Sequence, residues 1–332
     1  MPEFRQDPVT GRWVIIAPGR ASRPWHINAA IEQKQHEPCP FCAGNESMTP
    51  PEVWSERDSN TKANAPDWRV RVIPNKYPAL EDSSGKHGDN HGFYRSAHGL
   101  GVHEVIIESP RHVVNMSALG VAEFATILGA YSARLKTLQN DRRWRYLLIY
   151  KNHGERAGAT FEHIHSQLVA LPFVPREAQD EIDGARKHFD ATGRCIYCEM
   201  IEREGDRGER LVWNSARFIA FCPFAPRFGY ETWIFPKDHA SSFEQSSDQD
   251  LAALADCLRR CLLKLNGVVD HAPSNYAIHS APTEAASHPP YHWHMEILPQ
   301  ITRAAGFEWA TGAHMNSIAP EDAARLLRDG AL

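Results

Sequence analysis

The sequence contains no long hydrophobic run. None of its 332 residues lies in a stretch that approaches the roughly 20 consecutive apolar residues needed to span a bilayer. The first seven residues lack the apolar core of a signal peptide. A surplus of basic residues is also missing, because the formal net charge is −5, and this argues against a dedicated nucleic-acid-binding protein. These absences predict a cytoplasmic protein whose partners include neither membrane nor nucleic acid.

Length and composition are those of an ordinary globular protein. Apolar residues make up 42% of the chain and charged residues 23%, and 332 residues suffice for two domains that each bury a core. The seven cysteines are an odd number, and four of them form two Cys-x-x-Cys pairs. In a reducing compartment such pairs bind metal more often than they form disulfides.

One pattern occurs twice along the chain. The first half contains Cys39-Pro40-Phe41-Cys42, then His112, then His163-Ile164-His165, and the second half contains Cys195-Ile196-Tyr197-Cys198, then His239, then His292-Trp293-His294. His163 follows His112 by 51 residues, and His292 follows His239 by 53. This period is too long for a solenoid. We therefore predict two copies of one domain, with boundaries at 1–180 and 181–332.

The expected secondary structure supports an α+β fold. Within each copy, strand-like runs precede the lone histidine and the His-x-His motif, and an amphipathic helix lies between them. Ser117 is the expected N-cap of the first helix, Ser246 or Ser247 that of its counterpart, and Gly267 is expected just past the end of the latter. The predicted architecture is a tandem duplication of antiparallel sheets with packed helices.

The segment Glu162 to Val169 reads as a buried strand. Side chains at alternate positions of a strand share one face, so His163, His165 and Gln167 are expected to point together. Three polar side chains in a row on one strand face indicate a binding or catalytic site.

The repeated cysteines and histidines have the spacing of metal ligands. Two thiolates in a tight turn and two imidazoles suit tetrahedral zinc. One predicted zinc site consists of Cys39, Cys42, His112 and His163, and the other of Cys195, Cys198, His239 and His292. Because protein ligands fill all four positions, both zinc ions are expected to be structural. His279 lies near the second set, either as a further ligand or as an ordinary hydrogen-bonded histidine.

If zinc binds His163, His165 is the free imidazole on its strand. A neutral imidazole can attack phosphorus and then leave, which suits transfer of a phosphoryl or nucleotidyl group. Gln167 could donate a hydrogen bond to a phosphate oxygen. In the second copy His294 and Glu296 take these places, and a carboxylate would repel phosphate. That copy is therefore expected to be structural.

The chain resembles the galactose-1-phosphate uridylyltransferase family, a transferase branch of the histidine-triad superfamily. The resemblance covers nearly the whole length. It is carried by several motifs in order: Asp7-Pro8…Trp13-Val14, Arg20-Ala21-Ser22-Arg23-Pro24, Cys39-Pro40-Phe41-Cys42, Pro74-Asn75-Lys76-Tyr77-Pro78, Ser109-Pro110-Arg111-His112, Lys151-Asn152-His153-Gly154, Gly158-Ala159-Thr160…His165-Ser166-Gln167 and Ala305-Gly306-Phe307-Glu308.

The resemblance implies roles for individual residues. It implies that His165 carries the nucleotidyl group covalently and that Gln167 orients this intermediate. The residues implied to contact nucleotide, phosphate or hexose are Arg20, Arg23, Asn75, Asn152, Gly158, Thr160, Phe307 and Glu308. Taken singly, several of these could instead be surface charges or turn residues. The resemblance also implies a homodimer.

The activity implied by the resemblance is exchange of a uridylyl group between UDP-glucose and galactose 1-phosphate, as in galactose metabolism. His314 stands where well-characterised uridylyltransferases have a glutamine that helps to recognise galactose phosphate. The alternative within the family is therefore an ADP-glucose (or other nucleotide-sugar):phosphate adenylyltransferase. An alternative of another class is a nucleotide-binding or zinc-scaffold protein without turnover.

Overall fold

The computed structural model describes residues 2–22, 38–82, 90–91, 93–285, 290–302 and 304–330. The strands are β1 Glu3–Gln6, β2 Trp13–Ile16, β3 Trp54–Arg57, β4 Trp68–Pro74, β5 Asn90–His91, β6 Tyr94–Arg95, β7 Val102–Ile107, β8 Tyr146–His153, β9 His165–Leu171, β10 Leu211–Asn214, β11 Phe218–Phe221, β12 Thr232–Pro236, β13 Ser274–His279, β14 His294–Pro299 and β15 His314–Asn316. The helices are α1 Val121–Leu138, α2 Arg176–Thr192, α3 Ile196–Arg207, α4 Asp248–Val268, α5 Gly306–Thr311 and α6 Pro320–Asp329.

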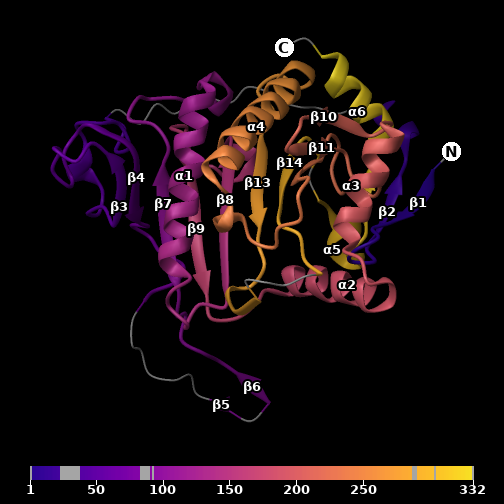
Figure 1. The fold of residues 1–332 in the computed structure, drawn as a ribbon, viewed down its shortest axis with the longest axis horizontal. Coiled ribbons are helices and arrows are strands. Elements are labelled where there is room, and N and C mark those ends of the chain that lie inside the picture. Colours follow the sequence, from indigo (N-terminus) through magenta and orange to yellow (C-terminus); the bar gives the residue numbers. More distant parts are fainter. Residues whose placement is uncertain are drawn as a thin grey trace.

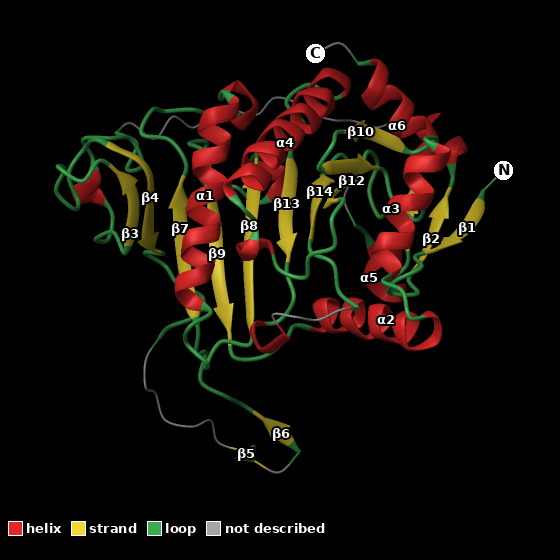
Figure 2. Cartoon of the chain, in the orientation of Figure 1, coloured by secondary structure: helices red, strands yellow, loops and turns green. Residues whose placement is uncertain are grey.

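Ten strands form one antiparallel sheet in the order β10-β11-β12-β14-β13-β8-β9-β7-β4-β3 (Figures 1 and 2). Read outward from the centre, each half of the chain contributes five strands in the same internal order, which confirms the predicted α+β fold and tandem duplication. The two expected sheets are joined into one, because β8 and β13 pair along their length from Ser274 with His153 to Ile278 with Ile149. Pairing these two edges leaves no open strand between the copies.

The two faces of the sheet are covered differently. Helices α1 and α4 lie side by side across one face and bury the main apolar core (Figure 1). On the opposite face, α2 and α3 cover the second copy through a smaller core that includes Ile182, Ile196, Phe221 and Phe235. In the first copy the side chains of Tyr150 and Gln167 on that face stay partly exposed. The division at residue 180 falls inside α2, and we retain it as a proposal.

The predicted start of the first helix was wrong. Ser117 lies in a 3-10 turn, where its backbone N–H donates to Asn115 Oδ1 at 3.0 Å. The helix begins later, at Val121, where Glu123 Oε2 accepts from Gly120 N at 2.8 Å. The expected apolar stripe is nevertheless buried in α1: Phe124, Ile127, Leu128, Tyr131, Leu135 and Leu138.

The counterpart helix α4 begins as predicted. Ser247 is its N-cap, and the Ser247 hydroxyl accepts from Asp250 N at 3.2 Å. The predicted end was wrong, because Gly267 lies inside the last turn and the helix runs on to Val268. Apolar packing of the last turn, in which Leu265 is buried, outweighs the low helix propensity of one glycine.

Strand β9 is shorter at its start than predicted. It begins at His165, whereas the backbone before it turns away so that Ile164 N donates to Val113 O at 2.8 Å. His163 therefore lies in a bend before the strand and does not continue the face formed by His165 and Gln167. Ser166 contacts Tyr131 of α1, so His165 and Gln167 point away from the helix-covered face.

A buried polar cluster lies beneath the start of β9. Glu108 accepts hydrogen bonds from Tyr131, Ser166 and Lys151, and its side chain is fully buried. The Lys151 ammonium also donates to the backbone carbonyl of His165 at 3.0 Å. Burial lowers the pKa of Lys151, and the Glu108 carboxylate opposes this shift. The cluster thus connects a charged pair in the core to the backbone of His165.

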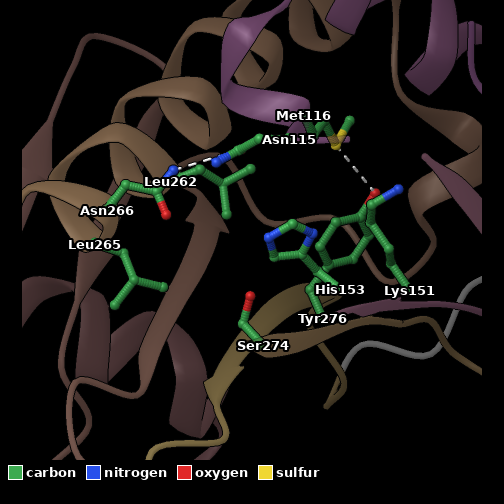
Figure 3. Close-up of a pocket in the computed structure, with 9 residues that line it drawn as sticks. All are labelled: Asn115, Met116, Lys151, His153, Leu262, Leu265, Asn266, Ser274 and Tyr276. Atoms are coloured by element: carbon green, nitrogen blue, oxygen red, sulfur yellow. Dashed lines mark hydrogen bonds between the residues drawn. The ribbon is translucent and has the colours of Figure 1, made fainter. Parts of the chain in front are cut away.

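A small cavity adjoins this cluster between α4, β8 and β13 (Figure 3). Its volume is about 20 Å³, enough for about one water molecule. The lining residues are Asn115, Met116, Lys151, His153, Leu262, Leu265, Asn266, Ser274 and Tyr276. The cavity lies on the helix-covered side of the sheet, opposite the His165 ring, so it does not belong to the candidate active site.

Replacing Lys151 with methionine should destabilise the protein by about 3–5 kcal/mol, because Glu108 would remain as a buried carboxylate without its cation. Adding Glu108→Gln should recover much of this loss, since the buried charge then disappears. Urea unfolding of the two variants and the wild type measures both effects. A double variant no more stable than Lys151→Met would contradict the buried ion pair.

Candidate active site and metal centres

The structure brings the first predicted ligand set together. Ligand atoms of Cys39, Cys42, His112 and His163 all lie within 4.8 Å of one another. His163 Nδ1 is 3.5 Å from Cys39 Sγ and 3.6 Å from Cys42 Sγ, and His112 Nδ1 is 3.6 Å from Cys42 Sγ. His163 Nε2 donates to Ser109 O at 2.8 Å, which leaves its Nδ1 lone pair facing the thiols. The group could hold a metal ion.

The second set has the same arrangement. Its ligand atoms also lie within 4.8 Å of one another, and they belong to Cys195, Cys198, His239 and His292. Burial varies along these four residues in the same order as in the first set. Cys198 Sγ lies 3.3 Å from His239 Nδ1 and 3.5 Å from His292 Nδ1. The repeat seen in the sequence is therefore also a repeat in space.

A third cluster contains Glu181, His279 and His294, whose polar atoms also lie within 4.8 Å. His279 Nδ1 is 3.1 Å from a Glu181 oxygen, and its Nε2 is 3.5 Å from Glu296 Oε2. Burial alone would lower the pKa of His279, but the two carboxylates raise it to about 9. Arg227 pairs with the same Glu296. His279 is thus a hydrogen-bonded cation in a network of charged side chains. In the second copy this network occupies the face that corresponds to the His165 face of the first copy.

His165 has the geometry of a nucleophile. Its Nδ1–H donates to the carbonyl of His163 at 2.8 Å, so Nε2 carries the lone pair. Among the described residues none hydrogen-bonds Nε2. Burial lowers the pKa of His165, the His163 carbonyl opposes the shift, and the positive charge of Lys151 lowers the pKa further. A neutral imidazole with an unpaired nitrogen can form a bond to phosphorus.

Gln167 follows His165 on the same strand face. Its Oε1 lies 2.8 Å from His103 Nε2 and 3.0 Å from the Tyr150 hydroxyl. His103 comes from β7 and Tyr150 from β8, the strands that flank β9. Neither residue was predicted from the sequence. Strand alternation predicts the face of its own strand on which each of these side chains lies. It does not predict the register between strands, which brings His103 and Tyr150 to Gln167.

Asn152 lies near the end of β8, and Gly158 lies in the loop that follows this strand. Gly158 has a φ of +90°, a conformation that favours glycine, and its carbonyl accepts from Asn152 Nδ2 at 3.4 Å. Asn275 of β13 donates to Asn152 Oδ1 and to Ala157 O, both at 2.8 Å. A residue of the second copy therefore shapes a loop of the first, and the sequence analysis missed it. Thr160 is exposed just beyond this loop.

The remaining predicted site residues are spread more widely. Asn75 lies beside His103, with Asn75 Nδ2 3.2 Å from His103 Nε2. Arg20 is exposed in the 3-10 turn Pro18–Ser22, and Arg23 lies outside the described residues.

Phe307 and Glu308 lie on α5, which is well apart from β9 of the same chain (Figure 1). Glu308 caps its own helix by accepting from Ala305 N at 2.9 Å. Within one chain the structure does not bring these two residues to His165.

Comparisons with known proteins match the chain over its whole length. A family model described as galactose-1-phosphate uridyl transferase, N-terminal domain, matches residues 1–175, and a model for a domain of unknown function matches residues 94–329. An ADP-glucose phosphorylase of Arabidopsis thaliana is 36% identical, over 100% of this chain and 93% of its own length. A galactose-1-phosphate uridylyltransferase of Thermotoga maritima is 28% identical, over 99% and 98%.

Solved structures give the same ranking. The crystal structure of an ADP-glucose phosphorylase from Arabidopsis thaliana with bound ADP-glucose superimposes with a TM-score of 0.85 at 34% identity, covering 100% of both chains. A uridylyltransferase structure superimposes with a TM-score of 0.77 at 27% identity, covering 99% of this chain and 98% of that one.

Substituting Asn275 with alanine should loosen the loop around Asn152 and Gly158, because two hydrogen bonds from one amide are lost. We expect a stability loss of about 1–2 kcal/mol and faster hydrogen exchange at 152–158. Asn140→Ala is a matched control, because the Asn140 amide donates to Lys136 O at the exposed end of α1. Equal exchange of this loop in both variants would refute the assignment.

Proposed function

We propose that this chain, which belongs to the galactose-1-phosphate uridyl transferase family, transfers an adenylyl group from ADP-glucose to inorganic phosphate through a covalent nucleotidyl-His165. Nucleotidyl transfer is the chemistry of the family. The observation that carries the proposal for this chain is the His165 ring, whose Nδ1–H donates to the His163 carbonyl and whose Nε2 has no hydrogen-bond partner among the described residues. The choice of ADP-glucose is supported by the relative with 36% identity, against 28% for the uridylyltransferase. This favours the alternative prediction over the UDP-glucose reaction.

In the first half-reaction, His165 Nε2 attacks the α-phosphorus of ADP-glucose. A nitrogen–phosphorus bond forms, and the bond from the α-phosphorus to the bridging oxygen breaks. Glucose 1-phosphate leaves with that oxygen and both electrons of the broken bond. His165 keeps its Nδ1–H, and the His163 carbonyl that accepts it stabilises the positive charge that the ring acquires.

In the second half-reaction, an oxygen of inorganic phosphate attacks the same phosphorus. The bond to His165 breaks, ADP is released, and the imidazole returns to its neutral form. We assign Gln167 to hold a phosphate oxygen through its amide nitrogen, and Asn152, Gly158 and Thr160 to contact the phosphates of the nucleotide. Arg20, Arg23 and Asn75 are proposed nucleotide contacts.

We propose that both cysteine–histidine groups hold zinc. Bonds of about 2.3 Å to sulfur and 2.0 Å to nitrogen place tetrahedral ligand atoms about 3.5 Å apart. The sulfur–nitrogen distances of 3.3–3.6 Å in the two groups fit this value. Each ion would stabilise the fold, and the first would fix His163 and thereby the carbonyl that orients His165. All four ligands come from the protein, so these ions have no open position for substrate.

We also propose a homodimer in which a partner segment completes each active site. The separation of α5, which carries Phe307 and Glu308, from β9, which carries His165, supports this arrangement (Figure 1). A second copy would allow its α5 to approach the hexose in the partner's site. A cytoplasmic location is consistent with seven free cysteines, which a reducing compartment preserves.

Incubating the protein with ADP-glucose labelled in the adenine ring, without acceptor, should attach one adenylyl group per chain to His165. Inorganic phosphate should then discharge the label as ADP. His165→Gly should take up no label and lose at least about 10³-fold in turnover, because no other group supplies the nucleophile. Intact-mass spectrometry and peptide mapping measure the label, and zinc content shows that the variant is folded.

The same experiment separates the alternatives. UDP-glucose with galactose 1-phosphate should react at least about tenfold less efficiently in kcat/KM than ADP-glucose with phosphate. The reverse preference would establish the uridylyltransferase reaction. A folded, zinc-containing wild type that no nucleotide sugar labels would support a scaffold without turnover.

Metal analysis of the purified protein should find two zinc ions per chain. Cys39→Ser should reduce this to one and lower the Tm, because one site loses a ligand. The substitution Asn140→Ala, at an exposed residue just past the end of α1, controls for handling. A third ion that disappears in His279→Gln would show that the Glu181–His279–His294 cluster also binds metal, and would overturn the two-ion assignment.

A further inference from the structure

Among the described residues, the side-chain amide of Gln167 is held only at its oxygen end. Its oxygen faces His103 Nε2 at 2.8 Å and the Tyr150 hydroxyl at 3.0 Å. An amide has a donor nitrogen and an acceptor oxygen of nearly equal size, so these neighbours decide which of the two turns toward bound phosphate. With the oxygen engaged, the two N–H groups point the other way.

The tautomer of His103 determines which end of the Gln167 amide turns toward bound phosphate. The backbone N–H of Ala79 donates to His103 Nδ1 at 3.0 Å, so the Nδ1 lone pair is occupied and the ring hydrogen lies on Nε2. Nε2–H can then only donate, and the Gln167 oxygen is its acceptor. Asn75 Nδ2, at 3.2 Å from the same nitrogen, also carries hydrogens, and the Asn75 oxygen accepts from Tyr77 N at 2.9 Å. Asn75 therefore does not compete as an acceptor.

Tyr150 cannot fix the orientation of the Gln167 amide. A phenolic hydroxyl can donate to an amide oxygen or accept from an amide nitrogen by rotating its hydrogen. It would satisfy Gln167 in either orientation. Of the two neighbours of the Gln167 oxygen, His103 is the one restricted to a single role.

We propose that His103 is a positioning residue that fixes the Gln167 amide with its nitrogen toward the substrate phosphate. This rests on the proposed function, because it assumes that Gln167 donates to a phosphate during nucleotidyl transfer. The ionised phosphate groups of a nucleotide sugar accept hydrogen bonds and do not donate them. A reversed amide would present its oxygen to the anion and repel it. Ala79, His103 and Gln167 therefore form a chain from a loop backbone to the reacting group.

The test compares three variants at the two flanking positions. His103→Leu removes the donor, and single-turnover adenylylation of His165 should slow about tenfold with little change in KM, because the hydrogen bond that holds the amide nitrogen toward the phosphate is lost. His103→Gln offers an acceptor to Ala79 and a donor to Gln167, and should recover most of the rate. Tyr150→Phe should slow the step less than about threefold, since His103 still sets the orientation. Unfolding midpoints and zinc content of the variants exclude global damage.

A double-mutant cycle with Gln167→Ala gives the decisive readout. If His103 acts through Gln167, His103→Leu should slow the Gln167→Ala protein by less than about twofold. A further tenfold loss in that background would mean that His103 acts elsewhere, and would overturn the inference. Failure of His103→Gln to restore the rate, with the fold intact, would also count against it.

Failure of the inference differs from failure of the proposed function. If the wild type forms no adenylyl-His165, the proposed function fails before any His103 variant is measured. If it forms this intermediate and Gln167→Ala slows its formation, while His103→Leu has no effect, only the role of His103 is wrong.

Discussion

The hydrogen bond from His165 Nδ1–H to the carbonyl of His163 is the contact on which the proposed chemistry depends. It places the ring hydrogen on Nδ1 and so leaves a lone pair on Nε2. The acceptor belongs to a residue whose own ring faces two thiols and whose Nε2–H is held by Ser109. The bend that removes His163 from β9 therefore serves both groups, because it turns one imidazole toward the thiols and its carbonyl toward the other imidazole.

The second copy has the same contact between an imidazole and a histidine carbonyl, but the corresponding face of its sheet is covered. His294 Nδ1 lies 3.1 Å from the carbonyl of His292, as in the first copy. Helices α2 and α3 cover the surrounding face, and Glu181 of α2 reaches His279. Glu296 stands two residues after His294, where the first copy has Gln167, and it is paired with Arg227. The two copies thus share the scaffold, whereas in the second copy the face around His294 is buried.

Much of the site could be predicted from the sequence because its elements are local or repeated. The Cys-x-x-Cys turns, the matching histidine intervals and the His-x-His-x-Gln motif identify residue types whose chemistry is specific. Contacts that depend on strand register could not be predicted in this way. His103, Tyr150 and Asn275 lie on three different strands, and only the pairing of β7 with β9 and of β8 with β9 and β13 brings each to its partner. The bend at His163 was missed because strand alternation alone gives no sign of it.

Strand β9 connects two chemically different sides of the protein through alternate residues. Ser166 points to the buried Glu108 cluster, while His165 and Gln167 point to the partly open face. Lys151 of that cluster donates to the His165 carbonyl. Burial is the main cause that lowers the pKa of the His165 ring, the Lys151 charge lowers it further, and the Glu108 charge opposes the shift. The catalytic candidate is therefore fixed mainly through its backbone and one ring nitrogen. Among the described residues the other ring nitrogen has no hydrogen-bond partner, as a nucleophile requires, and the supporting charges are buried behind the strand, where they do not compete for the phosphate.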